Sequence, residues 1–306
     1  MSNLSVFEHK VSSDEENTRI DKLLVTLNSD FSRQQIQTWI KENYVTVNNQ
    51  MTKANYKCKQ GDLIQWSIPE DKKVSIEPEP IPLNILYEDD DLIVINKPKG
   101  MLVHPTNVVQ SGTLVNALKH HTKNLSTLSG EERPGIVHRL DQYTSGVLVV
   151  CKNDETHAYL KEQFKQHLVK RIYEAIVHGV IEHEKGIIQA PIGRDSKNRL
   201  KMAVISTGKE AETHFKTLER MVQYTHVECR LITGRTHQIR VHMQYMNHPI
   251  VGDELYSHIK TDYIHHQALF AKTIGFKHPR TKEFVQFSVE RPDDFENLLQ
   301  LCRNKA

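Results

Sequence analysis

The strongest chemical signal in the sequence is the tetrapeptide His138 to Asp141 (HRLD), which lies between two apolar stretches. Polar residues in such a place are expected close to the protein core. Asp141, beside the guanidinium of Arg139, then has two interpretations: a salt-bridged structural residue, or a single functional carboxylate that arginine keeps in its charged form. The spacing alone leaves both open.

A second segment, residues 233–242 (TGRTHQIRVH), follows a predicted strand through a glycine into a predicted helix. Arg240 lies one step off the apolar stripe of that helix, so its guanidinium can reach a neighbouring loop. Together with Arg235 it places two arginines at a strand-to-helix turn, a position that suits an anion. The alternative is that both arginines only contact solvent.

Two further segments carry weaker signals. Residues 171–177 (RIYEAIV) alternate as a strand does and place Tyr173 on one face, either as a core residue or as a ring that stacks on a nucleic-acid base. Residues 96–105 (NKPKGMLVHP) begin at a strand end and continue as a tight loop with two lysines. By itself this loop indicates only local positive charge.

The elements that must position these residues fall into two domains, because 306 residues exceed what one hydrophobic core usually supports. We expect a flexible leader over residues 1–17, a small α+β domain over 18–69, an extended proline-containing tether over 70–82 and a second domain over 83–306. In the second domain, β-rich runs alternate with helical stretches. This order predicts a mixed sheet with helices packed on it.

The first domain carries a row of side chains suited to RNA. Ser32, followed three residues later by Gln35, predicts a capping box that opens a helix. On the face of that helix opposite its apolar stripe, Arg33, Gln37 and Lys41 recur at four-residue steps. We call these three residues the cationic row, and its spacing predicts contact with a phosphate backbone.

The composition excludes several other classes of protein. The net charge of +2 comes from 40 basic and 38 acidic residues, so any binding of a polyanion must depend on local charge. No apolar run approaches the ~20 residues of a membrane helix, and the start of the chain lacks the order of a signal peptide. A cytoplasmic protein is therefore expected. Its four cysteines lie far apart without a C-x-x-C pair, which predicts reduced, structural thiols.

The 18 histidines call for a test of metal chemistry. His237 and His242 are five residues apart and would point to different faces of a helix, and no H-E-x-x-H or Cys/His ligand set occurs. The phosphate-loop and dinucleotide fingerprints are absent as well. The sequence therefore predicts no metal and no nucleotide cofactor.

In their order along the chain, the four segments resemble the RluA-type RNA pseudouridine synthases: NKPKGMLVHP, HRLDQYTSG, RIYEAIVHG and TGRTHQIRVH. Residues 19–24, 32–33, 45–48 and 61–62 similarly resemble the S4 RNA-binding module. The combination is similar to the D-type ribosomal large-subunit enzymes. Two positions depart from the pattern: Gln142-Tyr143 replaces a charged pair, and Asn43 replaces a turn glycine, which asparagine tolerates.

The resemblance implies a fold, a reaction and a set of residue roles. It implies an S4-like domain followed by a pseudouridine synthase domain with a mixed or antiparallel sheet, acting as a monomer on RNA, in particular 23S ribosomal RNA. Asp141 would be the essential catalytic residue and Arg240 its partner, while Tyr173 would stack on the flipped uracil and help to remove the C5 proton. The residues expected to bind substrate are Arg139, Arg235, Lys97 and His104.

Some questions stay open on the sequence. Asp141 could attack C6 of uracil, attack C1′ of ribose or act as a base. A non-catalytic RNA-binding or ribosome-assembly factor and a metal-dependent hydrolase are the alternative functions. Tritium release from [5-³H]uridine RNA separates the synthase from a pure binder, and chelator sensitivity with a stoichiometric metal would indicate the hydrolase.

Overall fold

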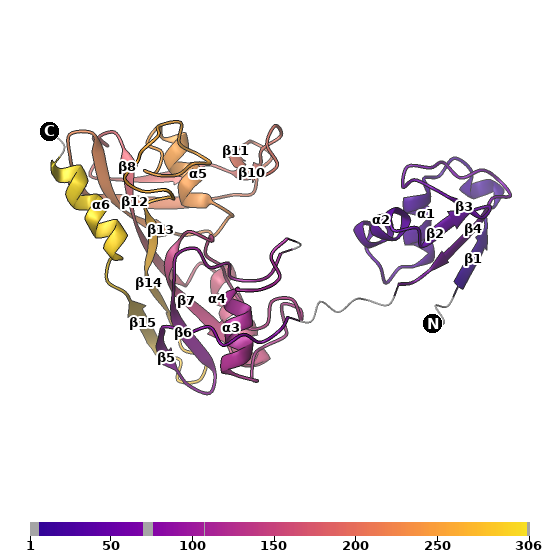
Figure 1. The fold of residues 1–306 in the computed structure, drawn as a ribbon, viewed down its shortest axis with the longest axis horizontal. Helices are drawn as coiled ribbons and strands as arrows, with labels where there is room; N and C mark the ends of the chain where they lie inside the picture. Colours follow the sequence, from indigo (N-terminus) through magenta and orange to yellow (C-terminus); the bar gives the residue numbers. More distant parts are fainter. Residues whose placement is uncertain (1–5, 70–75, 107, 305–306) are drawn as a thin grey trace. The chain divides into compact units, whose positions relative to one another are not determined.

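In a computed structural model the chain forms two compact units, residues 1–75 and 76–306 (Figure 1). The structure describes residues 6–69, 76–106 and 108–304. Each unit has its own hydrophobic core, as expected for two domains.

The first unit is a four-stranded antiparallel sheet with two helices, and its strands have the order β1-β4-β2-β3. Its elements are β1 (Val6–Lys10), a 3₁₀ turn (Ser13–Glu15), α1 (Ile20–Leu27), α2 (Arg33–Lys41), β2 (Val45–Val47), β3 (Gln50–Met51) and β4 (Leu63–Ser67). Apolar side chains from both helices and from β4 form the core, among them the fully buried Ile20, Leu24, Ile36 and Ile64.

Local signals in the sequence of this unit are confirmed. The Ser32 hydroxyl accepts a hydrogen bond from the Gln35 backbone N–H, and the Gln35 side chain accepts one from the Ser32 backbone N–H at 2.8 Å. This capping box opens α2 as predicted. Asn43 has a φ of 65°, so it takes the left-handed conformation expected at the turn that follows.

The prediction of a flexible leader over residues 1–17 is wrong for its described part. Val6–Lys10 form β1, which pairs with β4 along its whole length, and the Val11 N–H donates to the Asp62 carbonyl at 2.9 Å. The Glu15 carboxylate accepts hydrogen bonds from the Ser12 N–H and from His9. The acidic composition concealed a short edge strand, because edge strands tolerate polar side chains. Residues 1–5 lie outside the described part.

The second unit is built on a nine-stranded sheet with the order β5-β6-β7-β14-β8-β13-β12-β9, and β15 pairs with β14. Its first elements are β5 (Ile85–Glu88), β6 (Leu92–Lys97), α3 (Leu114–His121), β7 (Ser145–Cys151), α4 (Asp154–Lys165), β8 (Lys170–His178) and β9 (Lys185–Gln189). They are followed by β10 (Ile192–Arg194), β11 (Met202–Val204), β12 (Glu212–Arg220), β13 (Tyr224–Leu231), α5 (Gln238–Tyr245), β14 (Leu269–Lys277), β15 (Phe284–Ser288) and α6 (Asp293–Asn304). The hairpin β10–β11 is a separate small sheet.

The sheet is mixed, as predicted, because β7 and β14 run parallel while its other described pairs are antiparallel. β14 lies between β7 and β8, so the HRLD loop that precedes β7 is brought toward Tyr173 on β8. Gly146 makes this approach possible. It has a φ of +115°, and a Cβ atom there would lie 2.1 Å from the Ala271 carbonyl oxygen.

The prediction that residues 70–82 form an extended tether between the domains is wrong where the structure describes it, because residues 76–82 belong to the second unit. Ile76 is buried in the core of the second unit, and the Asn116 side chain donates to the Glu77 carbonyl at 2.8 Å. The Glu79 N–H donates to the Asn116 carbonyl at 3.0 Å. The start of this segment is therefore attached to the second unit by the buried Ile76 and by hydrogen bonds to Asn116 of α3. Residues 70–75 lie outside the described part.

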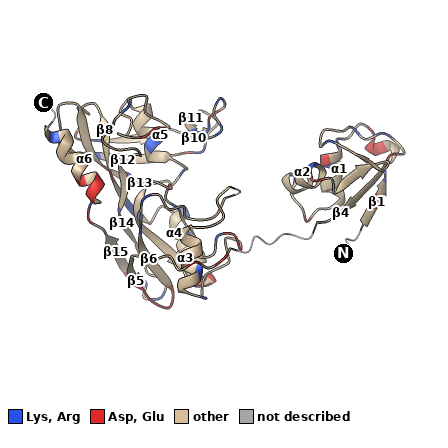
Figure 2. Ribbon diagram, in the orientation of Figure 1, with Lys and Arg blue, Asp and Glu red and all other residues tan. Residues whose placement is uncertain are grey.

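Charged residues of both signs are distributed over both units (Figure 2). Any positive surface for RNA must therefore come from a local arrangement of side chains. Within the described residues, none of the helices is both long enough and apolar enough to span a membrane.

Candidate active site

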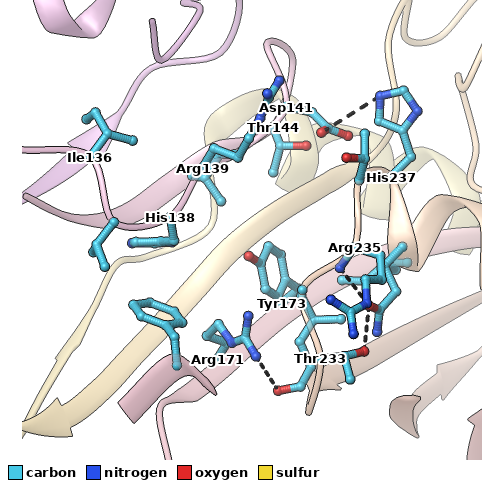
Figure 3. A pocket seen from close by; sticks show the side chains of 18 of the residues that line it. Ile136, His138, Arg139, Asp141, Thr144, Arg171, Tyr173, Thr233, Arg235 and His237 are labelled. Carbon is cyan, nitrogen blue, oxygen red and sulfur yellow. Dashed lines mark hydrogen bonds and ion pairs between the residues drawn. The ribbon is translucent and has the colours of Figure 1, made fainter. Parts of the chain in front are cut away.

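A cavity of about 690 Å³ opens in the second unit, where the four sequence segments meet (Figure 3). Its wall contains residues from the HRLD loop, from β8 and from the turn between β13 and α5. Of the seven residues predicted for this site, six line the cavity: Asp141, Tyr173, Arg240, Arg139, Arg235 and His104.

Asp141 is held in this wall by Arg240. The Arg240 Nη1 donates to Asp141 Oδ2 at 3.0 Å, while Nε and Nη2 donate to the two carboxylate oxygens of Asp253 at 2.7 and 2.9 Å. The Asp141 side chain retains 19% of its exposure, whereas Asp253 is buried. Burial alone would lower the pKa of Arg240, but the two carboxylates raise it above its ordinary value. The guanidinium thus joins an accessible carboxylate to a buried one.

His237 is the other neighbour of the Asp141 carboxylate, at 3.9 Å between Nε2 and Oδ1 (Figure 3). It precedes α5 in the left-handed conformation, with φ of 56°, and its Nδ1 lies 2.8 Å from the Tyr256 hydroxyl. The Tyr256 hydroxyl oxygen accepts a hydrogen bond from the Met202 N–H. Its own O–H group can therefore donate a hydrogen bond to Nδ1 of His237. This pattern favours the His237 tautomer with its proton on Nε2, facing Asp141. Burial lowers the pKa of His237 and keeps the ring neutral.

Tyr173 lies in the wall of the same cavity and is 7% exposed. Burial raises the pKa of its phenol to about 12. The hydroxyl therefore stays protonated at neutral pH, and the ring is suited to stack on a base. A protonated phenol cannot accept a proton from C5 of uracil. The structure without RNA therefore disfavours the prediction that Tyr173 helps to remove this proton.

The other substrate-binding candidates in the wall differ in how free they are. Arg139 is exposed, and its side chain forms no hydrogen bond or ion pair within the described residues. The Arg235 Nε donates to the Glu210 carbonyl at 2.8 Å. His104 is buried, and this burial, together with the charges of Arg139 and Arg133, lowers its pKa to about 4.

The prediction that Lys97 binds substrate is wrong: its side chain is fully buried and does not line the cavity. Its Nζ donates to the carbonyl oxygens of Pro98, Met101 and Gln142 at 2.8, 2.8 and 3.1 Å. Lys97 thereby ties the 98–101 loop to the residue that follows Asp141. A buried lysine is rare and is not expected from sequence, because its charge must be removed from water.

We predict that the stability contributed by Lys97 depends on pH. Burial lowers the pKa of its amine from 10.5 to about 7. Between these values the unfolded chain binds one proton more than the folded chain, so the free energy of unfolding rises with pH. The contribution is complete above the unfolded value and is lost as the pH falls through about 7. Compared with Lys97→Met, the wild type should gain at most about 1.4 kcal/mol per pH unit in this window.

Denaturant titrations at about pH 6.5 and about pH 9.5 measure this gain. Lys99→Met is the matched control, because Lys99 is partly exposed and pairs with Asp294 at 2.6 Å. A stability difference between wild type and Lys97→Met that is the same at both pH values would contradict the prediction.

Two members of the predicted cationic row, Arg33 and Gln37, bind a carboxylate of the first unit. Arg33 donates to Asp21 Oδ2 through Nε and Nη2 at 3.0 and 2.9 Å, and Gln37 donates to the same oxygen at 2.7 Å. Arg19 binds both oxygens of this fully buried carboxylate at 3.0 Å. Burial would raise the pKa of Asp21, but these hydrogen bonds lower it to about 2. Of the three residues of the cationic row, Lys41 is the one that is exposed and has no ion pair within the described residues.

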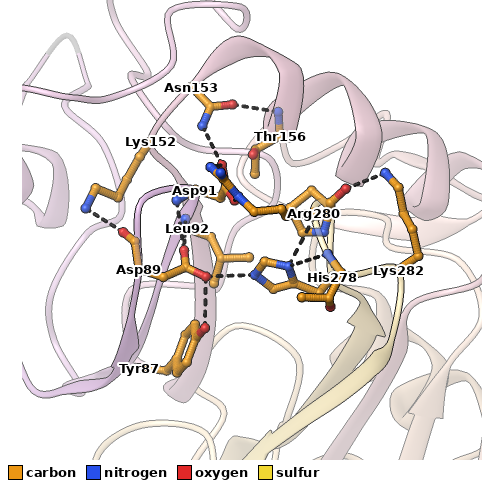
Figure 4. A network of polar contacts seen from close by, with 12 residues as sticks. Tyr87, Asp89, Asp91, Leu92, Lys152, Asn153, Thr156, His278, Arg280 and Lys282 are labelled. Atoms are coloured by element: carbon orange, nitrogen blue, oxygen red, sulfur yellow. Dashed lines mark hydrogen bonds and ion pairs between the residues drawn. The ribbon is translucent and has the colours of Figure 1, made fainter.

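Among the described residues, one cluster has ligands in reach of a metal: Asp89, Asp91 and His278 (Figure 4). Protein donors already occupy its carboxylate oxygens. Arg280 binds Asp91 through Nε and Nη2 at 2.6 and 2.9 Å, and His278 lies 2.8 Å from Asp89 Oδ2. The cluster connects the β5–β6 turn to the end of β14 and lies outside the cavity wall.

Several residues around Asp141 and Arg240 were not predicted from the sequence. Asp253, Tyr256 and His237 all position Arg240 or Asp141, yet they were not among the candidates. The signal that could have found Asp253 is the placement of Arg240 in a buried helix, because a buried guanidinium needs more than one acceptor.

The cavity wall thus combines one accessible carboxylate, a buried tyrosine ring and two exposed arginines that have no partner among the described residues. The sequence matches the RNA pseudouridylate synthase family over residues 91–245 and the S4 domain over residues 18–64. It is 48% identical to an uncharacterized RNA pseudouridine synthase, YlyB, of Bacillus subtilis (strain 168), covering 96% of this chain and 97% of that protein.

Two other comparisons agree with this match. The ribosomal large subunit pseudouridine synthase D of Neisseria meningitidis serogroup A is 42% identical, covering 94% of this chain and 79% of that protein. The solved structure of human RNA pseudouridylate synthase domain containing 1 superposes with a TM-score of 0.56 at 25% identity, over 77% of this chain and 98% of that one. The chain belongs to the RNA pseudouridine synthase family, and it isomerises uridine in RNA to pseudouridine.

Proposed function

We propose that this enzyme modifies large-subunit (23S) ribosomal RNA in the cytoplasm and that Asp141 is its catalytic carboxylate. The assignment of Asp141 rests on its position: within the described residues it is the one carboxylate in the cavity wall. Arg240 donates a hydrogen bond to it. The substrate class is supported by relatives named as ribosomal large subunit enzymes.

A single accessible carboxylate suits an isomerase better than a hydrolase. The reaction breaks the N1–C1′ bond of uridine, rotates the uracil and joins C5 to C1′, while the C5 proton is lost and N1 gains one. Hydrolytic glycosidases use two facing carboxylates to activate water, and water must not reach the intermediate here. Asp253 is the second carboxylate nearby, but its oxygens accept from Arg240 and from the backbone N–H groups of Leu255 and Tyr256.

The other residues of the wall are assigned by their positions. Tyr173 would stack on the flipped uracil, which needs a π-face in place of its neighbours in the RNA. Arg139, exposed and unpaired in the described part, would enter the space left by the base or bind a phosphate. Arg235 and the neutral His104 would contact the ribose or the phosphate chain.

Tritium release from 23S ribosomal RNA transcribed with [5-³H]uridine tests the function. We expect release of the tritium of one or a few uridines per transcript. Pseudouridine mapping in cells with and without the protein should identify the same uridines. Release from transfer RNA but not from the ribosomal transcript would contradict the proposed substrate.

Lys41 of α2 is the residue of the cationic row that we expect to contact RNA. Lys41→Gln should weaken binding to the ribosomal transcript and reduce the slope of log affinity against log salt by about 0.7–0.9, the effect of one phosphate contact. Its free energy of unfolding should stay unchanged, since the side chain has no ion pair in the described residues. Arg33→Gln, by contrast, should destabilise the first unit because Asp21 loses a partner. Filter binding across a salt series and thermal melts measure both effects, and an unchanged slope for Lys41→Gln would show a merely solvated lysine.

A further inference from the structure

We propose that Arg133 and Arg139 form a clamp of two guanidinium groups for a phosphodiester next to the target uridine. This inference rests on the proposed function and extends it, because it names the part of the RNA that the outer cavity wall recognises. Arg133 lies outside the family segments discussed above, yet it lines the same cavity as Asp141 and Arg139.

The loop that carries Arg133 is held in place by hydrogen bonds within the protein. The Arg133 N–H donates to the Gly130 carbonyl at 3.1 Å, and the Arg133 carbonyl accepts from the Ile136 N–H at 3.1 Å. On one side of these turns, the Ser129 hydroxyl lies 2.8 Å from His157 of α4. On the other side, the Gly135 N–H donates to the Ser126 carbonyl, and the Gly135 carbonyl accepts from the Cys151 N–H. Pro134 further restricts the backbone of Arg133.

The other arginines of the cavity wall already have partners within the protein. Arg240 binds two carboxylates, the Arg171 Nη2 donates to the Ile232 carbonyl at 2.7 Å, and the Arg235 Nε donates to a carbonyl as well. Arg133 and Arg139 are exposed, and neither side chain has a hydrogen bond or ion pair within the described residues. Two arginines without counter-charges in the wall of one cavity form a positively charged site that favours binding of an anion.

A phosphodiester is the anion that suits these two arginines. His104 is buried in the wall of the same cavity, and its Nδ1 has no hydrogen-bond partner among the described residues. Burial lowers the pKa of His104, and the charges of Arg139 and Arg133 lower it further, so the ring stays neutral. A neutral ring leaves the positive charge at the two arginines. Planar guanidinium groups bind phosphate oxygens through two parallel hydrogen bonds, and each phosphodiester of RNA offers two such oxygens.

The test uses the full-length protein and a synthetic RNA hairpin that contains the uridine found by mapping. Arg133→Ala should weaken binding of this hairpin about tenfold or more, as expected for loss of a charged hydrogen bond, and reduce the saturating single-turnover rate by a smaller factor. Arg230→Ala is the matched control, because Arg230 is exposed and lies outside the cavity wall. It should bind like the wild type.

A neutral methylphosphonate, placed in turn at the phosphate on each side of the uridine, locates the contact. At one of the two positions the wild type should lose more affinity than Arg133→Ala alone costs, because the neutral group removes the contacts of both arginines. At that position Arg133→Ala should lose less than the wild type does, because only the contact of Arg139 is left to remove. Arg133→Lys should retain part of the affinity, since it keeps the charge without the planar fork. Losses that multiply at both positions, or an Arg133→Ala variant that binds like the wild type, would overturn the clamp. A wild type without activity on the full-length ribosomal transcript, assayed alongside, would instead overturn the proposed substrate.

Discussion

Replacement of Asp141 by asparagine is expected to lower the single-turnover rate on the order of 10⁴-fold or more, the range seen when a central catalytic residue is removed. An amide has neither the negative charge nor the basic oxygen that breaking the glycosidic bond requires. The substitution preserves shape, and the amide oxygen can still accept from Arg240 Nη1, which now lies 3.0 Å from the carboxylate. The fold should therefore survive, because Arg240 also keeps both bonds to Asp253.

RNA binding is the control for this variant. We expect Asp141→Asn to bind the ribosomal transcript as tightly as the wild type or more tightly, because removal of a negative charge from a cavity that binds RNA reduces repulsion. Tritium release under single-turnover conditions and filter binding at the same salt concentration measure both quantities. A rate reduced only a few-fold would show that another group carries the reaction, and Asp141 would then be the salt-bridged structural residue that the sequence also allowed.

The parts of the fold that the sequence predicts best are those with a complete local signal. The capping box at Ser32 and the alternating strand around Tyr173 each depend on neighbouring residues alone, and both occur where expected. The edge strand β1 was missed because its polar composition resembles a leader, and its partner β4 lies more than fifty positions away in the sequence. The helix α6 was not assigned, although Phe295, Leu298, Leu299 and Cys302 are buried at helical spacing.

The site shows the same division between local and distant information. The motifs place Asp141, Tyr173 and Arg240 in one cavity. The function of Lys97 could not be predicted in this way, because it depends on three carbonyl oxygens that converge only in the folded loops. Arg33 gives the same lesson in the first unit: a surface helix position suggests a free cation, but a buried carboxylate from another helix binds it.

Arg240→Ala is expected to have two large effects with different causes. Asp253, which is buried, would lose its counter-charge, and removal of one partner from a buried ion pair typically costs about 3–5 kcal/mol of stability. Asp141 would lose the group that orients it, so the saturating single-turnover rate should fall by roughly 10²–10³-fold, as for misplaced catalytic groups. Thermal melts and single-turnover assays, run well below the melting temperature, measure the two effects separately.

The double variant Arg240→Ala/Asp253→Asn separates positioning from stability. Neutralising Asp253 removes the uncompensated buried charge, so much of the lost stability should return, because the two changes affect one ion pair and are not additive. The rate should stay low, since Asp141 still lacks the donor at 3.0 Å.

Asp253→Asn alone keeps that donor and should reduce the rate far less than Arg240→Ala does. If the double variant recovered its rate together with its stability, or if Arg240→Ala raised KM while the saturating rate was unchanged, Arg240 would be a structural residue, and orientation of Asp141 would have to come from His237.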